Sequence, residues 1–299
     1  MSASLLAIVN PAAGRGRAAR NWPRLAAALA DAGVAVECAL TRAAGDATRL
    51  AALAQARGPR PVLAVGGDGT LHEVLNGLLG AGPRATLAVA PFGTGNDWAA
   101  FLGVPREPKA LAAVLARGRT RAVDAGRIEF AAGAGRESRY FINVAGAGYD
   151  ADVLERMAQS GARRFAYARA LAGGLVRYRA PHFTVRAAGT VVERPLFVAL
   201  AMLGRSCGGG MRFAPGARPD DGLLDLVTVD HVGPLAALCR LPRLYTDSIL
   251  ADRAVRSWPC TELTIDAEPA GRVEADGQLL GTTPATVRVL PGAIDFVVP

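Results

Sequence analysis

Lysine is almost absent from this sequence. Lys109 is the single lysine among 299 residues, although the formal net charge is +8, so arginine carries nearly all of the positive charge. A P-loop needs a lysine after its second glycine, and no such motif occurs. Lys109 lies in an ordinary amphipathic stretch, residues 108–115, unlike the lysine-bearing strand of protein kinases. If the chain binds nucleotide phosphates, it must use main-chain amides, arginines and metal.

Cysteine and long apolar runs are also scarce. The four cysteines are scattered without a CxxC spacing, which argues against a disulfide framework and against structural zinc. The strongly apolar runs, such as residues 195–204, are about half of the ~20 residues that a membrane span needs. Residues 5–9 run straight into a structured motif, without the organisation of a signal peptide. We therefore expect a cytoplasmic protein without a transmembrane segment.

The positive charge gives only weak information about partners. No basic stripe interleaved with aromatic residues and no nucleic-acid motif is present, so we expect no nucleic-acid partner. A basic surface favours anionic lipid headgroups, so peripheral binding at the inner membrane surface stays open. The arginine-rich segment 150–179 is amphipathic and either lies on a membrane or forms a solvated helix face, and we favour the solvated face. The sequence is also compatible with a homodimer.

The pattern of predicted elements changes near residue 125. An apolar fraction of 51% with 20% charged residues is typical of a globular chain. The first part alternates short apolar strands with helices, which predicts an α/β domain, residues 1–125, with a parallel sheet covered by helices on both faces. Short strands then follow, with helices expected over 150–175 and 234–250. This second part, residues 126–299, is predicted to be a β-sandwich, and its last strand can return to the first domain.

Three glycine-rich loops follow predicted strands of the first domain. They are residues 10–17 (Asn-Pro-Ala-Ala-Gly-Arg-Gly-Arg), 66–70 (Gly-Gly-Asp-Gly-Thr) and 93–97 (Gly-Thr-Gly-Asn-Asp). Glycine allows a ligand to approach the backbone closely, and a helix N-terminus attracts phosphate. One such loop alone is equally well a turn with Asp68 as a helix cap. Three loops at one edge of a sheet, where ligands bind in such folds, favour phosphate binding, and the arginines of the first loop can reach phosphates.

These motifs resemble those of the diacylglycerol kinase and sphingosine kinase catalytic family. Residues 215–225 resemble the family's P-x-A-x-x-D-D-G-x-L-D segment, and residues 273–278 resemble its V-x-x-D-G-E segment, so the resemblance covers nearly the whole chain. It implies an α/β nucleotide-binding domain followed by a β-sandwich, with ATP in the cleft between them. The implied activity is transfer of the γ-phosphate of Mg-ATP to a lipid hydroxyl at a membrane surface, with a diacylglycerol-like or sphingoid acceptor.

The resemblance also implies the site residues. Nucleotide contacts fall on Asn10, Pro11, Ala12, Ala13, Gly14, Thr41, Gly66, Gly67, Asp68, Gly69, Thr70, Leu71, His72 and Thr94. A structural magnesium ion would be held by the carbonyls of Arg218 and Leu223 and by the carboxylate of Asp221. Oxygen ligands suit this hard cation. Asp220 and Asp221 alone are equally compatible with an Asx-rich turn.

The sequence departs from the family at position 278. The family's motif ends in the glutamate that deprotonates the lipid hydroxyl, whereas this chain has Gln278, and an amide cannot accept that proton. A general base contributes typically ~10²–10⁴-fold in rate. Asp68 and Asp276 are the candidates to replace it. The alternatives are a catalytically weak nucleotide- or lipid-binding regulator and a soluble-substrate kinase of the NAD-kinase type. The Gly-Thr-Gly-Asn-Asp motif argues against the second of these.

Overall fold

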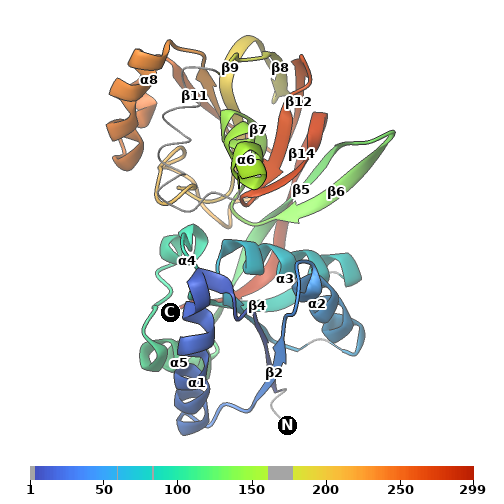
Figure 1. The fold of residues 1–299 in the computed structure, drawn as a ribbon, viewed down its shortest axis with the longest axis vertical. Helices are drawn as coiled ribbons and strands as arrows, with labels where there is room; N and C mark the ends of the chain where they lie inside the picture. Colours follow the sequence, from blue (N-terminus) through green and yellow to red (C-terminus); the bar gives the residue numbers. More distant parts are fainter. Residues whose placement is uncertain (1–3, 59, 83, 161–177) are drawn as a thin grey trace. The chain divides into compact units, whose positions relative to one another are not determined.

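The computed structural model describes the whole chain except residues 1–3, 59, 83 and 161–177 (Figure 1). The chain divides into two compact units. Unit 1 consists of Met1–Ala125, Pro219–Asp221 and Leu290–Pro299, and unit 2 of Gly126–Arg218 and Gly222–Val289.

Unit 1 is built on a parallel sheet. Its strands are β1 (Leu5–Val9), β2 (Val36–Leu40), β3 (Val62–Gly66), β4 (Ala85–Pro91) and the C-terminal part of β14 (Gln278–Val297). Neighbouring strands follow the order β14-β4-β3-β1-β2, and each of these pairs is parallel. Every residue of β1 and β3 is buried. Continuously apolar strands of this kind are typical of a parallel sheet that is covered on both faces.

The helices of unit 1 pack on this sheet. They are α1 (Ala13–Asp31), α2 (Asp46–Ala56), α3 (Asp68–Ala81), α4 (Asp97–Phe101) and α5 (Pro108–Arg117). In Figure 1, α1 and α5 lie on one side of the strands, and α2 and α3 on the other. The first residues of α1 are not helical, because Gly14, Arg15 and Gly16 adopt left-handed conformations. The regular helix therefore starts at Arg17.

Unit 2 is a mainly antiparallel β structure. Its strands are β5 (Thr120–Ala132), which begins in unit 1, β6 (Gly135–Phe141), β7 (Val144–Gly148), β8 (His182–Ala187), β9 (Thr190–Met202), β10 (Leu224–Asp230), β11 (Val255–Cys260), β12 (Glu262–Glu268), β13 (Arg272–Ala275) and the first part of β14. Hydrogen-bonded neighbours in its sheet follow the order β11-β10-β9-β7-β13-β14, and β12 pairs with β8 and β14. Phe130, Phe141 and Phe183 are fully buried in its core.

Four helical segments lie in the part of unit 2 that the structure describes. They are α6 (Tyr149–Ser160), α8 (Pro234–Arg240) and the 3-10 turns η1 (Leu241–Tyr245) and η2 (Ile249–Ala251). The prediction of one helix over 234–250 was wrong, because α8 ends just before Pro242, whose ring disfavours continuation of an α-helix. The predicted helix over 150–175 and the amphipathic segment 150–179 lie partly outside the described residues. Within the described residues, no helix is long and apolar enough to cross a membrane.

Pro219–Asp221 were assigned to the second domain from the sequence, but in the structure they group with unit 1. The Asp124 N–H donates to the Pro219 carbonyl at 2.7 Å. The Arg121 guanidinium binds the Asp220 carboxylate, with its Nε 2.8 Å from Oδ2. These contacts are made between residues about a hundred positions apart in the chain, so no local sequence pattern predicts them.

Candidate functional site

The predicted loops of unit 1 follow neighbouring parallel strands. Asn10 follows β1, Thr41 follows β2, Gly67 follows β3, and Phe92 and Gly93 follow β4. Because the strand order is β4-β3-β1-β2 and all pairs are parallel, these strand ends lie along one edge of the sheet. This is the edge at which open α/β sheets bind their ligands.

The loop after β1 is joined to the second loop by Asn10. The Asn10 side chain donates through Nδ2 to Thr70 Oγ1 at 3.1 Å, and its Oδ1 accepts the N–H of Ala12 at 3.1 Å. Further along the loop, Gly14 has φ +60°, and a Cβ atom there would lie 2.1 Å from the Phe92 carbonyl oxygen. Glycine is therefore required at position 14 both for its conformation and for its close contact with the loop after β4.

The second and third loops touch through their glycines. A Cβ atom on Gly93 would lie 2.1 Å from Gly67 Cα, and one on Gly67 would lie 2.9 Å from Gly93 Cα. The Gly93 N–H also donates to the Gly66 carbonyl at 2.7 Å. A side chain at either contact position would push the two loops apart, so their glycines have a packing role in addition to any contact with a ligand.

Asn96 and Asp68 complete the connection between these loops. Asn96 is 2% exposed and has a left-handed backbone with φ 63°, which asparagine tolerates better than most residues. Its Oδ1 accepts the N–H of Gly93, and its Nδ2 donates to the Gly93 carbonyl, both at 3.0 Å. Its main-chain N–H donates to Asp68 Oδ2 at 2.6 Å. The Gly-Thr-Gly-Asn-Asp segment is thus held by its own asparagine and by the aspartate of the second loop.

The arginines of the first loop make contacts within the protein. Arg17 Nη2 donates to the Gly93 carbonyl at 2.5 Å, which ties the start of α1 to the third loop. Arg20 Nη1 donates to the Arg15 carbonyl at 3.3 Å, and the Arg15 side chain is exposed. The expectation that these arginines reach phosphates stays a prediction.

The other predicted nucleotide residues differ in exposure. Thr94 is exposed and Thr41 is half-buried, with the Thr41 N–H bound to the Val9 carbonyl at 2.9 Å. Leu71 packs into the core, and the buried His72 ring lies with its Nε2 3.3 Å from Asn76 Nδ2. The side chains of Leu71 and His72 are thus buried, and the Leu71 N–H is bound to the Gly67 carbonyl at 3.0 Å.

The predicted metal ligands belong to one short segment, residues 218–223. Asp220 is paired with Arg121, and the Pro219 carbonyl accepts the Asp124 N–H, so these two neighbours already have protein partners. The predicted ligands are instead the Arg218 and Leu223 carbonyls and the Asp221 carboxylate, an oxygen-only set that suits magnesium. Gly222 has φ 74°, which turns the chain within the segment. In the described chain, no three His, Cys, Asp or Glu side chains form a metal-binding group, but a site built on carbonyls does not need one.

The predicted catalytic segment of unit 2 forms a tight β-hairpin. Ala275 on β13 pairs with Gln278 on β14, and the two residues between them, Asp276 and Gly277, have φ values of 48° and 79°. Two consecutive positive φ values are typical of a type I′ turn, for which Asp-Gly is a preferred sequence. The Asp276-Gly277 pair in the sequence is itself a signal for this hairpin. Gln278 is exposed just after the turn.

The Asp276 carboxylate holds the chain before β7. Its Oδ2 accepts the N–H of Ile142 at 3.1 Å, and its Oδ1 accepts those of Asn143 at 3.0 Å and Val144 at 3.1 Å. The Asp276 N–H donates in turn to the Val144 carbonyl at 2.8 Å. These bonds give Asp276 a structural role and engage both oxygens of its carboxylate.

Two carboxyl groups near this hairpin, the buried Glu274 and the half-buried Asp150, were not among the predicted site residues. Glu274 is 3% exposed, and its Oε2 accepts the Gly277 N–H at 2.8 Å. Burial, reinforced by the Asp150 charge, raises the pKa of Glu274 well above its ordinary value. Burial likewise raises the pKa of Asp150, in the first turn of α6, to about 6. Acids with raised pKa values occur at functional sites, but a sequence does not show which carboxylates lie together.

Comparison with known proteins assigns both units to described families. A family model for the diacylglycerol kinase catalytic domain matches residues 4–128. A model for the YegS C-terminal NAD kinase beta sandwich-like domain matches residues 143–298. The predicted order of a nucleotide-binding α/β domain and a β-sandwich-like domain agrees with these two matches.

Similar proteins match over almost the whole chain. A diacylglycerol kinase from Mycobacterium tuberculosis strain H37Rv is 32% identical, over 98% of this chain and 94% of its own length. A probable lipid kinase YegS-like from Pseudomonas aeruginosa strain PAO1 is 32% identical, over 91% of this chain and 88% of its own. A solved structure of a putative diacylglycerol kinase from Bacillus anthracis has a TM-score of 0.80 with 25% identity, covering 99% of this chain and 97% of that one. Yeast NADH kinase, with 9% identity and a TM-score of 0.53, shares the fold alone.

Proposed function

Because the chain belongs to the diacylglycerol kinase catalytic family, we propose that it is a lipid kinase that transfers the γ-phosphate of Mg-ATP to a lipid hydroxyl. The observation that carries this proposal is the connection of three glycine-rich loops at the carboxyl edge of one parallel sheet. The acceptor is a diacylglycerol-like or sphingoid lipid presented at a membrane surface.

The loops of unit 1 supply what phosphoryl transfer needs. Catalysis of this reaction consists largely of positioning the phosphates and neutralising their charge. Gly67 and Gly93 let the second and third loops lie in direct contact at the carboxyl edge of the sheet. The N-terminus of α3, which begins at Asp68, adds main-chain N–H groups and a positive dipole. Asn10, Thr70 and Asn96 fix the three loops to one another, so the site is organised before ATP binds.

The magnesium ion would be held by the Asp221 carboxylate and the Arg218 and Leu223 carbonyls, as the family resemblance implies. Bound there, it would stabilise the segment that carries its ligands. Asp220 has a different role, because it fastens the same segment to Arg121. The chain therefore offers two adjacent carboxylates with separable functions.

The reaction also needs an acceptor for the hydroxyl proton. As the lipid oxygen forms its bond to the γ-phosphorus, the bond from that phosphorus to the β–γ bridging oxygen breaks and ADP leaves. Gln278 cannot take the released proton. Three N–H donors already bind the two oxygens of Asp276, so we propose Asp68 of the second glycine-rich loop, which lies in the first turn of α3, where the phosphates are expected.

One alternative retains support from a specific residue. Gln278 in place of the family's glutamate favours a catalytically weak regulator that binds nucleotide or lipid without rapid turnover. The two functions differ in ADP release, which a kinase shows only with an acceptor lipid present and a regulator does not show at a useful rate.

The nucleotide site is tested by a negative charge introduced into the third glycine-rich loop. Thr94→Asp puts a carboxylate at an exposed position of the third loop, where it would repel phosphates without disturbing the core. Gly67→Val is less suitable, because its Cβ would press on Gly93 Cα and weaken the fold itself. We expect Mg-ATP to raise the Tm of the native protein and to lose that effect in Thr94→Asp.

The matched control is Thr120→Asp, which adds the same charge at an exposed residue of β5. This control should keep the full Mg-ATP shift and show ADP release that depends on added lipid. A Thr94→Asp protein that is folded and responds to Mg-ATP like the native chain would contradict the placement of the nucleotide.

A further inference from the structure

The segment from Pro234 to Ala251 exposes an unusual share of apolar side chains. Four of the nine large hydrophobic side chains that are exposed in the described chain lie here: Leu235 (75%), Leu238 (51%), Tyr245 (58%) and Leu250 (43%). No residue of α8 is buried. Leu235 and Leu238 are three residues apart, so they lie on the same face of this helix. We call these four side chains the apolar rim of unit 2.

The apolar rim is carried by an anchored element. On its inner side, Ala237 and Leu244 pack against the core cluster that contains Ile249 and Val255. Clusters of packed residues hold the α8–η1 segment to unit 2, so the exposed leucines are presented by ordered structure. In Figure 1, α8 stands at the margin of this unit.

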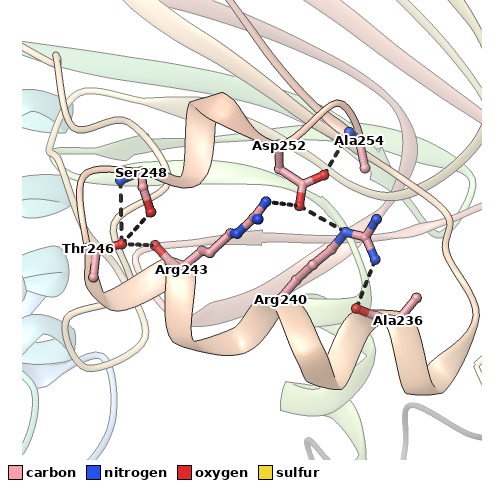
Figure 2. Close-up of polar contacts among 7 residues, drawn as sticks. All are labelled: Ala236, Arg240, Arg243, Thr246, Ser248, Asp252 and Ala254. Carbon is pink, nitrogen blue, oxygen red and sulfur yellow. Dashed lines mark hydrogen bonds and ion pairs between the residues drawn. The ribbon is translucent and has the colours of Figure 1, made fainter.

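Asp252 fixes the same element through two arginines, as Figure 2 shows. Its carboxylate is 5% exposed and accepts from Arg240 Nε at 3.0 Å and from Arg243 Nη1 at 2.8 Å. It also accepts the Ala254 N–H at 3.0 Å, and Arg240 reaches back to the Ala236 carbonyl at 2.9 Å. The buried Asp252 carboxylate thus orients both guanidinium groups. Because it neutralises only one of these two positive charges, the group of three side chains has a net positive charge beside the apolar rim.

The surroundings of the rim are positively charged overall. Arg212, whose N–H donates to the Leu244 carbonyl and whose Nη1 binds Asp247, joins Arg240, Arg243 and Arg253 in this region. Three of these arginines pair with two aspartates, Arg212 with Asp247 and both Arg240 and Arg243 with Asp252. Arg212, Arg243 and Arg253 are exposed. Elements that lie in the interface of an anionic bilayer typically combine apolar side chains, such as leucine and tyrosine, with exposed arginines.

We propose that the apolar rim and its arginines dock unit 2 on an anionic lipid bilayer, with Leu235, Leu238, Tyr245 and Leu250 entering the region between headgroups and acyl chains. This proposal rests on the proposed function, since a lipid acceptor must be reached in its membrane. A second copy of the chain is the less favoured occupant, because two such surfaces would bring their positive charges together.

The test is co-sedimentation of the full chain with vesicles in the absence of ATP. Vesicles of phosphatidylcholine alone are compared with vesicles that also contain phosphatidylglycerol. We expect the native chain to sediment with the anionic vesicles, and the double variant Leu235→Glu/Leu238→Glu to lose at least about tenfold in apparent affinity, since two apolar contacts and the charge balance are lost. The control Leu53→Glu/Val191→Glu, at two exposed apolar positions elsewhere, should bind like the native chain.

Sedimentation without ATP separates this proposal from the kinase proposal. If the native chain binds anionic vesicles and the rim variant does not, docking stands even when no lipid is phosphorylated. Equal binding by the rim variant and the native chain, or no binding by the native chain, would overturn it. A native dimer that the rim variant loses in size-exclusion chromatography, with vesicle binding unchanged, would assign the rim to a second copy and would also overturn it. Unchanged melting of the rim variant confirms that it folds.

Discussion

At the scale of single residues, the glycines of the three loops allow the loops to touch one another. Close approach of a ligand was the expected role. The structure adds contacts between the loops themselves, since Gly14 lies against the Phe92 carbonyl and Gly67 against Gly93. These contacts join residues from different strands, and a linear motif cannot reveal them.

The catalytic assignments at this scale depend on hydrogen bonds that a sequence does not contain. Asp68 and Asp276 were equivalent candidates from the sequence. The structure separates them, because Asp276 accepts three main-chain N–H groups in unit 2, whereas Asp68 bonds to Asn96 within the nucleotide loops.

A first residue-scale prediction concerns the proton acceptor. Asp68→Asn keeps an oxygen for the Asn96 N–H, so the loops should stay joined while the base is lost. Turnover on lipid should fall by ~10²-fold or more, with ATP binding retained. Gln278→Glu is the partner experiment, because it restores an acceptor of nearly the same shape at an exposed position. If native turnover is good and Asp68→Asn equals it, Asp68 is not the base; if only Gln278→Glu is active, the regulator interpretation is correct.

A second residue-scale prediction concerns Asp150 and pH. Burial raises its pKa to about 6, so the folded chain holds this proton more tightly than the unfolded chain, whose ordinary value is 3.8. Stability from this group is complete below the unfolded pKa and is lost as pH rises towards 6. At pH 8, Asp150→Asn should therefore raise the free energy of unfolding by up to ~3 kcal/mol.

Urea unfolding between about pH 4 and pH 8 measures this effect, because that range covers the ordinary and the raised pKa of Asp150. The advantage of Asp150→Asn should be small at the acid end and grow towards neutrality, with a further gain because the variant no longer repels the charge of Glu274. Asp31→Asn, at an exposed position, is the control. If the difference in unfolding free energy between Asp150→Asn and the native chain does not change with pH, burial of the Asp150 charge does not determine how stability depends on pH.

At the scale of elements, the strands and helices of unit 1 follow the periodicity of the sequence closely, because β1, β3 and β4 are buried runs flanked by glycine-rich loops. Unit 2 was harder. The hairpin of β5 and β6 was not predicted, and the helix expected over 234–250 breaks into α8, η1 and η2 at Pro242. Elements whose packing comes from distant strands carry weaker local signals than amphipathic helices.

An element-scale prediction concerns the turn at residues 218–223. If it binds magnesium, the ion alone should raise the Tm without nucleotide, and Asp221→Ala should abolish that rise. Asp220→Ala is the matched control, because it removes the adjacent carboxylate that pairs with Arg121. This control should lower stability but keep the response to magnesium. A normal response in Asp221→Ala would leave the segment as a turn without a metal.

At the scale of the whole molecule, the sequence predicted two consecutive domains, and the family matches over residues 4–128 and 143–298 follow the same order. The path of the chain is less simple than this order. Pro219–Asp221 and Leu290–Pro299 belong to unit 1, the second through the pairing of Ile294, Asp295 and Phe296 with β4. The return of the last strand was expected, whereas the return of Pro219–Asp221 depends on tertiary contacts, which composition and periodicity do not encode.

The measurement that tests the central claim most directly follows the γ-phosphate itself. ATP labelled at the γ position is incubated with magnesium, the native chain, and a panel of dispersed lipid extracts together with NAD as a soluble competitor. We expect the label in a chloroform-soluble product, and we expect Thr94→Asp to lose that product while Thr120→Asp keeps it. Label recovered in NAD with none in any lipid would contradict the assignment of this chain as a lipid kinase.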